Sequence, residues 1–411
     1  MSNTLKFGNG LWATKEGSTL AYNDENGNYK PLPFNFERAG SATRVNKEGL
    51  IEVVGNNEPR IDFSNDAKGA LLLEPSRTNI NTNSESFNTY SLVGGSFISD
   101  NLISPNGFLT ADSFVEDSND SQHTIRKDIA VSAGNYTVSC FVKGVDRFLS
   151  IYPQGVGVAY SVFDLNNGTI TKTGGADYID SKIENYGNGW YRCILTYSVI
   201  DGDSRVHLYL SNISSGTGAE APIYIGNGSI MSFYGLQLEQ GSYATSYIPT
   251  SGSIATRVAD VCNNGGNEQV FNDSEGVLYV EISAFSETNL FEAISINNNS
   301  TSDRIFIGYF SDDLYITILD GGQAKYDVNT PINVKQNNKI AVKYKAQDFS
   351  FYLNGFEINA SAGINGGTTP SGLSELSFNR GDGVEPFYGN IKQIKYFDKA
   401  LTDQELIALT S

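Results

Sequence analysis

The sequence predicts an all-β protein made of tandem antiparallel β-sandwiches with one short C-terminal helix. Three observations support this fold class. The 411 residues include 42 Gly, 23 Tyr and 23 Phe but only 18% charged residues, a composition that favours strands and turns over helices. Segments of alternating apolar and polar residues recur at short intervals, and turn-forming Asn, Asp and Gly separate them. A single helix signal lies near the C-terminus.

Residues 1–80 are expected to form an N-terminal attachment segment of β-hairpins. Short apolar stretches alternate there with turn-forming residues, as in the segment 22–28. Residues 1–36 are too few to bury a core of their own, so their apolar side chains require another surface. These side chains are Leu5, Phe7, Leu11, Trp12, Leu20, Leu32, Phe34 and Phe36. Either they pack onto the first sandwich, or they attach the protein to a partner.

Residues 81–262 are expected to form the first sandwich. Strand patterns cover 136–142, 158–165, 190–199, 205–211 and 229–239, and Asn- and Gly-rich turns lie between several of them. Trp190 opens an apolar strand directly after one such turn, so we expect it in the core. The polar, Gly-rich stretch 262–267 then predicts a linker to the next domain.

Residues 268–411 are expected to form the second sandwich, with strand patterns that begin at Val277. The helix follows these strands. Thr402 has the position of its N-cap, and Glu405, three residues later, completes a capping box. Leu401 and Leu406 have the spacing of a hydrophobic staple across the start of the helix.

The charge of the chain excludes several classes of partner. It has 46 acidic and 28 basic residues, which gives a net charge of −18. Nucleic acids and anionic membrane surfaces need clustered Lys and Arg, so we expect neither as a partner. No apolar segment approaches the roughly 18 residues of a membrane-spanning helix, and the N-terminus lacks the pattern of a signal peptide. We therefore expect neither membrane insertion nor export by the usual secretory route.

Residues that carry catalysis are scarce. The chain has only two His, His123 and His207, and three Cys, which excludes regular His/Cys zinc sites. Cys140, Cys193 and Cys262 are expected to be free thiols, and a Cys140–Cys193 disulfide between neighbouring strands is the alternative. The GxxxxGK[ST], HExxH and GxSxG motifs and a Glu-x-Asp-x-Glu strand are all absent, which predicts a protein without enzymatic activity. A hydrolase with acids distant in the sequence remains the alternative.

The candidate ligand-binding residues are aromatic or acidic. Sugar rings pack on exposed aromatic faces, and the candidates for this contact are Tyr152, Tyr160, Tyr309 and Tyr315. The alternative is that each is a half-buried strand residue. Carboxylates in turns suit Ca²⁺, and the candidates are Asp201, Asp203, Asp312 and Asp313. The alternative is that these turns are only solvated, and we expect no other cofactor.

The last third of the chain resembles the concanavalin A-like, laminin-G-type jelly roll. Within 339–358, Tyr352-Leu-Asn-Gly is similar to a hairpin of that family. The segments Phe387-Tyr-Gly-Asn-Ile and Ala400-Leu-Thr-Asp-Gln-Glu-Leu resemble its closing strand and helix. The resemblance implies a lectin-type fold at 268–411. It implies no single function, because this fold serves binding, adhesion and catalysis alike.

Residues 1–262 resemble modules of bacteriophage tail and fibre proteins, in the segments FERAGSATRVNKEGLIEV, PRIDF…ALLLEPSRTN, NGWYRC and YGLQLEQGSYATSYIPTSGSIATRVADV. The resemblance implies a carbohydrate-binding-module-like jelly roll at 81–262. It also implies a virion structural or adhesion protein, assembled in the host cytoplasm, that contacts other virion proteins and a host-surface glycan. Analogy with phage fibres suggests a homotrimer. A bacterial carbohydrate-binding surface protein and a tail-spike glycan depolymerase are the alternatives.

Overall fold

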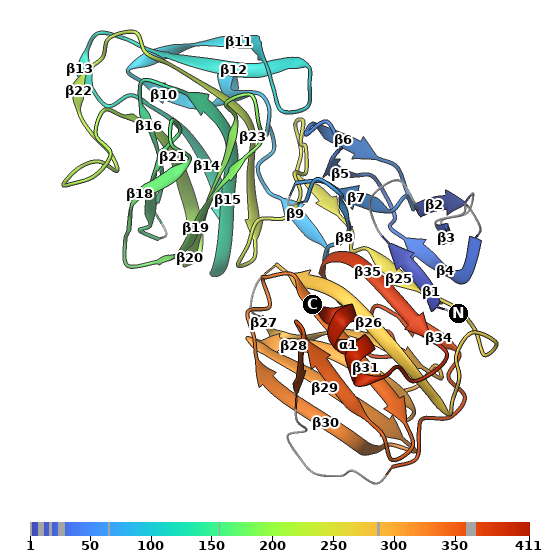
Figure 1. Ribbon diagram of the computed structural model, residues 1–411. Coiled ribbons are helices and arrows are strands. Elements are labelled where there is room, and N and C mark those ends of the chain that lie inside the picture. The colour runs from blue at the N-terminus through green and yellow to red at the C-terminus, as the bar shows by residue number, and fades with distance from the viewer. Residues whose placement is uncertain are drawn as a thin grey trace. The chain divides into compact units, whose positions relative to one another are not determined.

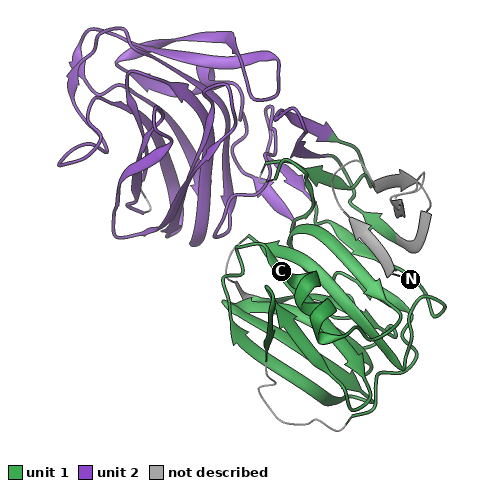
Figure 2. Ribbon diagram, in the orientation of Figure 1, with its two compact units in different colours: residues 1–41, 54–75, 258–411 green, residues 42–53, 76–257 purple. Residues whose placement is uncertain are grey.

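The computed structural model describes residues 2–6, 12–15, 19–23, 29–64, 66–155, 157–285, 288–358 and 367–411. The chain forms two compact units (Figure 2). Unit 1 contains residues 1–41, 54–75 and 258–411, and unit 2 contains residues 42–53 and 76–257. Each unit is an antiparallel β-sandwich (Figure 1), which confirms the predicted fold class.

Unit 1 has two facing sheets and a smaller sheet that shares their core. The larger facing sheet has the order β33-β32-β31-β26-β35-β8-β7, and β1 also pairs with β35; its strands are β1 (Ser2–Lys6), β7 (Arg60–Asp62), β8 (Ala70–Leu73), β26 (Glu275–Ala284), β31 (Asn338–Lys345), β32 (Ser350–Leu353), β33 (Phe356–Ile358) and β35 (Gly389–Phe397). The opposite sheet has the order β30-β29-β28-β27-β34, with β27 (Thr288–Asn297), β28 (Arg304–Ser311), β29 (Asp313–Asp320), β30 (Gln323–Pro331) and β34 (Glu375–Ser377). The small sheet contains β2 (Trp12–Lys15), β3 (Thr19–Asn23), β4 (Tyr29–Glu37) and β25 (Val261–Asn263).

Alternation along the strands determines which side chains form the core of unit 1. Ile305 and Ile307 of β28 are buried there, as are Ile316 and Ile318 of β29. The residues between them point to the other face of the five-stranded sheet, because successive strand side chains alternate in direction. This outer face carries the candidate site described below.

The helix α1 (Asp403–Thr410) closes unit 1 as the sequence predicts. The Thr402 side chain accepts a hydrogen bond from the backbone of Glu405, and the Glu405 side chain accepts one from the backbone of Thr402. Leu406 is fully buried and Leu401 packs against its cluster, which confirms the predicted staple. In the part of the chain that is described, no helix is long and apolar enough to cross a membrane.

The hairpin between β32 and β33 has the two-residue turn that the family resemblance of Tyr352-Leu-Asn-Gly implies. Leu353 pairs with Phe356, so Asn354 and Gly355 form the whole turn. Their φ angles are 48° and 88°, and Asn-Gly is the dipeptide that adopts this left-handed conformation at least cost.

Unit 2 contains two six-stranded sheets and several short ladders. The first sheet has the order β10-β14-β21-β16-β17-β18, with β10 (Ser91–Val93), β14 (Thr124–Val131), β16 (Phe148–Gln154), β17 (Tyr160–Asp164), β18 (Thr169–Gly174) and β21 (Gly202–Ser211). The second has the order β11-β12-β23-β15-β20-β19, with β11 (Gly95–Ile103), β12 (Leu109–Glu116), β15 (Gly134–Gly144), β19 (Tyr178–Asn185), β20 (Tyr191–Val199) and β23 (Ile230–Gln240). The short elements are β5 (Ala42–Val45) with β6 (Ile51–Val54), β9 (Arg77–Asn79) with β24 (Ala255–Arg257), β13 (Asp120–Ser121) with β22 (Tyr224–Ile225), and the 3₁₀ helix η1 (Phe87–Thr89).

The core of unit 2 contains the residues that the strand patterns predict. Trp190 is 3% exposed, as expected, and its indole Nε1 donates to the carbonyl of Ile103 at 3.1 Å. Cys140 on β15 lies directly opposite Cys193 on β20, and both are free thiols. Cys262, in unit 1, is also free and buried.

The N-terminal segment contributes to unit 1, the unit that contains the sandwich expected at 268–411. The sequence patterns did not predict this pairing. Phe34 and Phe36 are fully buried in the core of unit 1. In addition, β8 pairs with the first three residues of β35, Gly389 to Ile391. Of the other six apolar residues considered above, Phe7 and Leu11 lie outside the described residues, whereas Leu5, Trp12, Leu20 and Leu32 lie on β1, β2, β3 and β4. The segment 262–267, expected to be a linker, is packed as well: Cys262 is 2% exposed, and Gly265 bonds with Leu376. The ranges 1–80, 81–262 and 268–411 thus differ from the two units, since residues 1–80 are divided between them.

A buried charge network joins distant segments within unit 1. Asp260 accepts hydrogen bonds from Arg38 Nη1 at 3.1 Å, from Arg60 Nη2 and from the backbone of Glu74 at 2.8 Å. Arg60 Nη1 also pairs with Glu74 at 2.6 Å. The side chains of Arg38, Arg60 and Asp260 are fully shielded from solvent, so each charge depends on these contacts.

Candidate functional site

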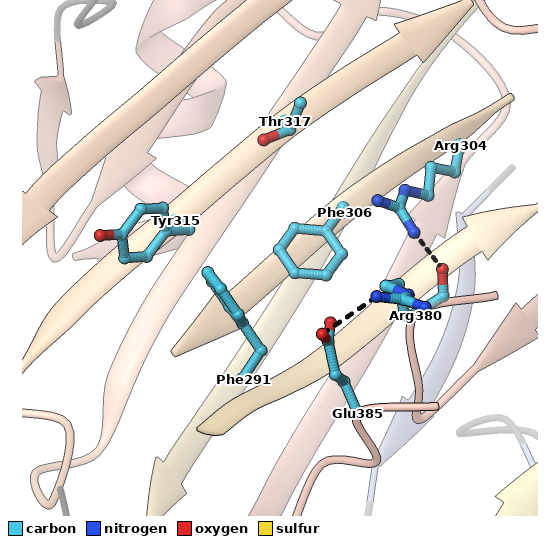
Figure 3. Close-up of a pocket in the computed structure, with 7 residues that line it drawn as sticks. All are labelled: Phe291, Arg304, Phe306, Tyr315, Thr317, Arg380 and Glu385. Carbon is cyan, nitrogen blue, oxygen red and sulfur yellow. Dashed lines mark hydrogen bonds and ion pairs between the residues drawn. The ribbon is translucent and has the colours of Figure 1, made fainter. Parts of the chain in front are cut away.

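A hollow lies on the outer face of the five-stranded sheet of unit 1 (Figure 3). It has a volume of about 230 Å³ and opens to solvent. Residues of β27, β28 and β29 that point away from the core form its floor, and a loop that precedes β35 forms one rim. Its lining consists of Phe291, Arg304, Phe306, Tyr315, Thr317, Arg380 and Glu385.

Three aromatic rings form the apolar wall of the hollow. The ring centroid of Phe291 lies 5.1 Å from that of Tyr315 and 6.2 Å from that of Phe306, and both pairs meet edge to face. Gly308 leaves room for this packing, since a Cβ atom there would lie 2.6 Å from the Phe306 ring. Phe291 and Tyr315 are half-buried, so part of each ring remains in contact with solvent.

Two hydroxyl groups lie beside the aromatic wall. Asn329 Nδ2 donates to the hydroxyl oxygen of Tyr315 at 2.9 Å, and Thr317 Oγ1 donates to Asp327 Oδ1 at 2.6 Å. The Tyr315 hydroxyl accepts its bond from Asn329, and its own hydrogen can therefore be donated to a ligand.

The loop before β35 supplies the charged rim. Arg380 pairs with Asp382 at 2.7 Å and with Glu385 at 3.0 Å, so two carboxylates balance its charge. The hydrogen bond between Arg380 and Asp382 is the main cause that raises the pKa of Arg380 and lowers that of Asp382. Glu385 has a φ of 56°, a left-handed conformation that Glu rarely adopts, and its carbonyl accepts a bond from Ala293 N at 3.1 Å. That bond fixes the loop to β27.

Arg304 lies between the wall and the rim. Its Nη1 donates to the backbone carbonyl of Arg380 at 2.7 Å, and its guanidinium carbon lies 5.1 Å from the centroid of Phe306 (Figure 3). Burial and the neighbouring charge of Arg380 lower the pKa of Arg304, because both disfavour the charged form. The Nε of Arg304 is buried and has no hydrogen-bond partner among the described residues.

The two tyrosines predicted in unit 1 have opposite positions. Tyr315 lines the hollow, whereas Tyr309 is 2% exposed and packs in the core. Tyr309 points inward because it shares the alternation of Ile305 and Ile307 on β28. Its ring is therefore not presented to a ligand at the surface.

The two tyrosines predicted in unit 2 lie together on the outer face of one sheet. Tyr152 on β16 and Tyr160 on β17 have ring centroids 5.7 Å apart, and Tyr152 also lies 6.4 Å from Tyr209. Lys172 Nζ lies 4.9 Å from the Tyr160 centroid and pairs with Glu220. The rings of Tyr152 and Tyr160 meet edge to face, and Lys172 occupies one side of the Tyr160 ring.

The acidic candidates do not gather into a metal site. Asp201 and Asp203 are exposed in unit 2, and Asp312 is exposed and Asp313 half-buried in unit 1. Asp201 Oδ1 accepts a hydrogen bond from Ala133 N, which is the ordinary use of a carboxylate in a turn. No group of three or more His, Cys, Asp or Glu side chains that could hold a metal occurs in the described ranges.

Most of the hollow was not predicted from the sequence. Phe291, Arg304 and Phe306 carry an available signal, because they alternate with the apolar core residues of their strands. Arg380 and Glu385 carry none: they belong to a polar loop, and only the fold brings Arg380 to Arg304.

Comparison with known proteins gives one family match. Residues 278–407 match the family model described as the concanavalin A-like lectin/glucanases superfamily. No characterised protein sequence matches the chain. Similar solved structures include Ruminococcus gnavus IT-sialidase CBM40 bound to α2,3-sialyllactose (17% identity, 34% of this chain and 84% of that chain, TM-score 0.30) and domains LG4-5 of the mouse laminin α1 chain (10% identity, 70% and 90%, TM-score 0.25). The chain therefore carries a concanavalin A-like domain at residues 278–407.

Proposed function

We propose that this protein binds glycans and that the hollow of unit 1 is a binding site. The observation that carries the proposal is an aromatic wall and several hydrogen-bonding groups within one hollow. The C–H faces of a sugar ring pack on aromatic rings, while its hydroxyls need donors and acceptors. Phe291 and Tyr315 supply the apolar contact, and Arg304, Glu385 and the Tyr315 hydroxyl supply the polar ones. The family match of residues 278–407 supports this proposal.

A glycan array followed by calorimetric titration of the full chain tests the proposal. We expect Phe291→Ala to weaken binding of a captured oligosaccharide by about tenfold or more, because it removes apolar contact area. Phe356→Ala is the matched control, since this ring on β33 is 76% exposed and lies outside the hollow. Equal affinities for the wild type and a folded Phe291→Ala variant would contradict the assignment.

The aromatic surface of unit 2 is the second candidate site for a glycan. We expect Tyr152→Ala to reduce binding less than Phe291→Ala does, because Lys172, the cation beside the unit 2 rings, is already paired with Glu220. The same titration compares the two variants. A larger loss for Tyr152→Ala would move the main site to unit 2.

We further propose that the protein is a bacteriophage virion component, such as a tail fibre, head fibre or spike, that recognises a host-surface glycan. The resemblance of 36–53 and 234–261 to phage tail and fibre modules supports this.

We also propose that the protein is a trimer. Three copies would lengthen the residence time of the protein on a glycan surface, since avidity strengthens binding by weak single sites by a factor of roughly 10² to 10⁴. Light scattering of the recombinant chain tests the trimer, and electron microscopy of purified particles tests its place beside other virion proteins. A monomer in solution and on the particle contradicts the trimer.

We propose that the hollow binds without hydrolysis and without Ca²⁺. Glycosidases commonly use a pair of carboxyl groups. Among the seven lining residues of the hollow, Glu385 supplies a single carboxyl group, and Arg380 already pairs with it. Release of reducing ends from a bound polysaccharide, abolished in Glu385→Gln, would contradict the first part. Loss of glycan binding in a chelator, restored by Ca²⁺, would contradict the second.

A further inference from the structure

We propose that the hollow selects acidic sugars, and that Arg304 binds their carboxylate. This inference rests on the proposed glycan-binding function and names the ligand class of the same site. The geometry that carries it is one half-buried guanidinium beside an aromatic wall, with no carboxylate paired to it among the described residues.

The two arginines of the hollow differ in how their charges are balanced. Arg380 pairs with both Asp382 and Glu385. Arg304 donates one hydrogen bond to a backbone carbonyl, which carries only a partial charge. A guanidinium has five N–H donors, and its fork matches the two oxygens of a carboxylate. Arg304 is thus the cation of the hollow that a ligand carboxylate can still pair with.

The environment of Arg304 makes such a ligand favourable. Its guanidinium is half-buried beside the Phe306 ring, so an ion pair formed there is partly shielded from water. Because Nε is shielded from solvent, a ligand carboxylate would accept from the Nη groups of Arg304. Charge-assisted hydrogen bonds of this kind are about twice as strong as neutral ones.

The neighbouring residues determine what kind of anion fits. Phe306 lies against the guanidinium, and Phe291 and Tyr315 continue the apolar surface away from it. A ligand must therefore present an apolar ring face next to a carboxylate, which is the arrangement of an acidic sugar. Glu385 on the rim repels additional negative charge, which disfavours dianions such as phosphate esters. The chain carries a net charge of −18, so selection here depends on local contacts and not on long-range attraction.

A matched pair of ligands tests the inference directly. The probes are a hexuronic-acid-terminated oligosaccharide and its carboxyl-reduced twin, which differ only in a carboxylate and a hydroxymethyl group. We expect the wild-type chain to bind the acidic form about 10- to 100-fold more tightly by calorimetry. A sulfated neutral oligosaccharide forms a third arm, and its preferential binding would assign the site to sulfate and overturn the carboxylate proposal.

Variants of Arg304 then locate the effect. Arg304→Gln should bind both twins equally, at the affinity of the neutral twin for the wild type, and Arg304→Lys should keep part of the preference. Arg44→Gln, at a partly exposed arginine of unit 2 that pairs with Glu52 at 2.6 Å, is the matched control and should keep the full preference. Equal binding of the twins by the wild type, or an unchanged preference in Arg304→Gln, overturns the inference while glycan binding stands. Absence of binding to every glycan overturns the proposed function and the inference together.

Discussion

Phe34 and Phe378 pack against each other with ring centroids 5.4 Å apart, although 344 positions separate them (378 − 34). Phe34 belongs to β4 and Phe378 follows β34, so both ends of the chain contribute to one core. This contact lies within unit 1. The sandwich that residues 258–411 build therefore depends on residues that precede unit 2 in the sequence.

We expect Phe34→Ala to destabilise unit 1 by about 3 to 5 kcal/mol, the usual cost of removing a fully buried aromatic ring. Denaturant unfolding followed by circular dichroism measures the change in the free energy of unfolding. Phe356→Ala is the control and should change it little, because that ring is 76% exposed. A stable, folded fragment of residues 268–411 would contradict the dependence on Phe34.

We expect Asp260→Asn to destabilise the protein by roughly 3 to 5 kcal/mol, because it leaves two buried arginines without their shared carboxylate. The control is Glu52→Gln, which breaks a pair with Arg44 at the surface and should cost at most about 1 kcal/mol. Thermal unfolding of both variants provides the comparison. Similar melting temperatures for the two would show that the network contributes little.

We expect stability to decrease as the pH rises from about 4.5 to about 8, in part because of Glu292. Burial raises the pKa of Glu292 to about 8. In this range the unfolded state has released the proton while the folded state retains it, so the free energy of unfolding falls by up to about 1.4 kcal/mol per pH unit.

Glu292→Gln should remove this contribution, because the amide is neutral at every pH in the range. Urea unfolding of both proteins at several pH values measures the two slopes. The variant should be the more stable protein above pH 8 and should differ little near pH 4. Parallel slopes for the two proteins would exclude Glu292 as a source of the pH dependence.

We expect all three cysteines to be protected in the native protein and free after unfolding. Burial raises the pKa of the Cys140, Cys193 and Cys262 thiols, so the reactive thiolate is scarce. A thiol reagent should therefore react slowly with the folded chain and should titrate three groups in denaturant without reductant. A count of one would reveal a disulfide between Cys140 and Cys193, which lie opposite each other on paired strands.

Features that depend on neighbouring residues in the sequence could be predicted. The capping box of Thr402 and Glu405 and the turn at Asn354-Gly355 need only local chemistry, and both form as expected. Strand alternation likewise separates core from surface, and it places Tyr309 inside and Tyr315 outside. Applied to each tyrosine in turn, it would have removed Tyr309 as a surface candidate.

Features that depend on contacts between distant segments could not be predicted. Arg304 and Arg380 meet because a polar loop is fixed to β27, and no periodic pattern marks that loop. The pairing of β8 with β35 is similar: β8 is apolar and β35 alternates apolar with polar residues, and neither pattern specifies which strand is the partner. A polar, Gly-rich stretch such as 262–267 is typical of a linker, yet Cys262 and Gly265 are bound into the packed unit.

The division of unit 1 into separate stretches of sequence has a consequence for the order in which the protein matures on the ribosome. Residues 1–41 and 54–75 emerge first, and residue 258 follows 183 residues after residue 75 (258 − 75), which takes roughly 10 to 40 s at 5 to 20 residues per second. During that interval unit 2 is completed, whereas β8 has no β35 to pair with. A chain whose translation stops early would release a finished sandwich attached to an unpaired apolar strand, which chaperones and proteases can recognise as incomplete.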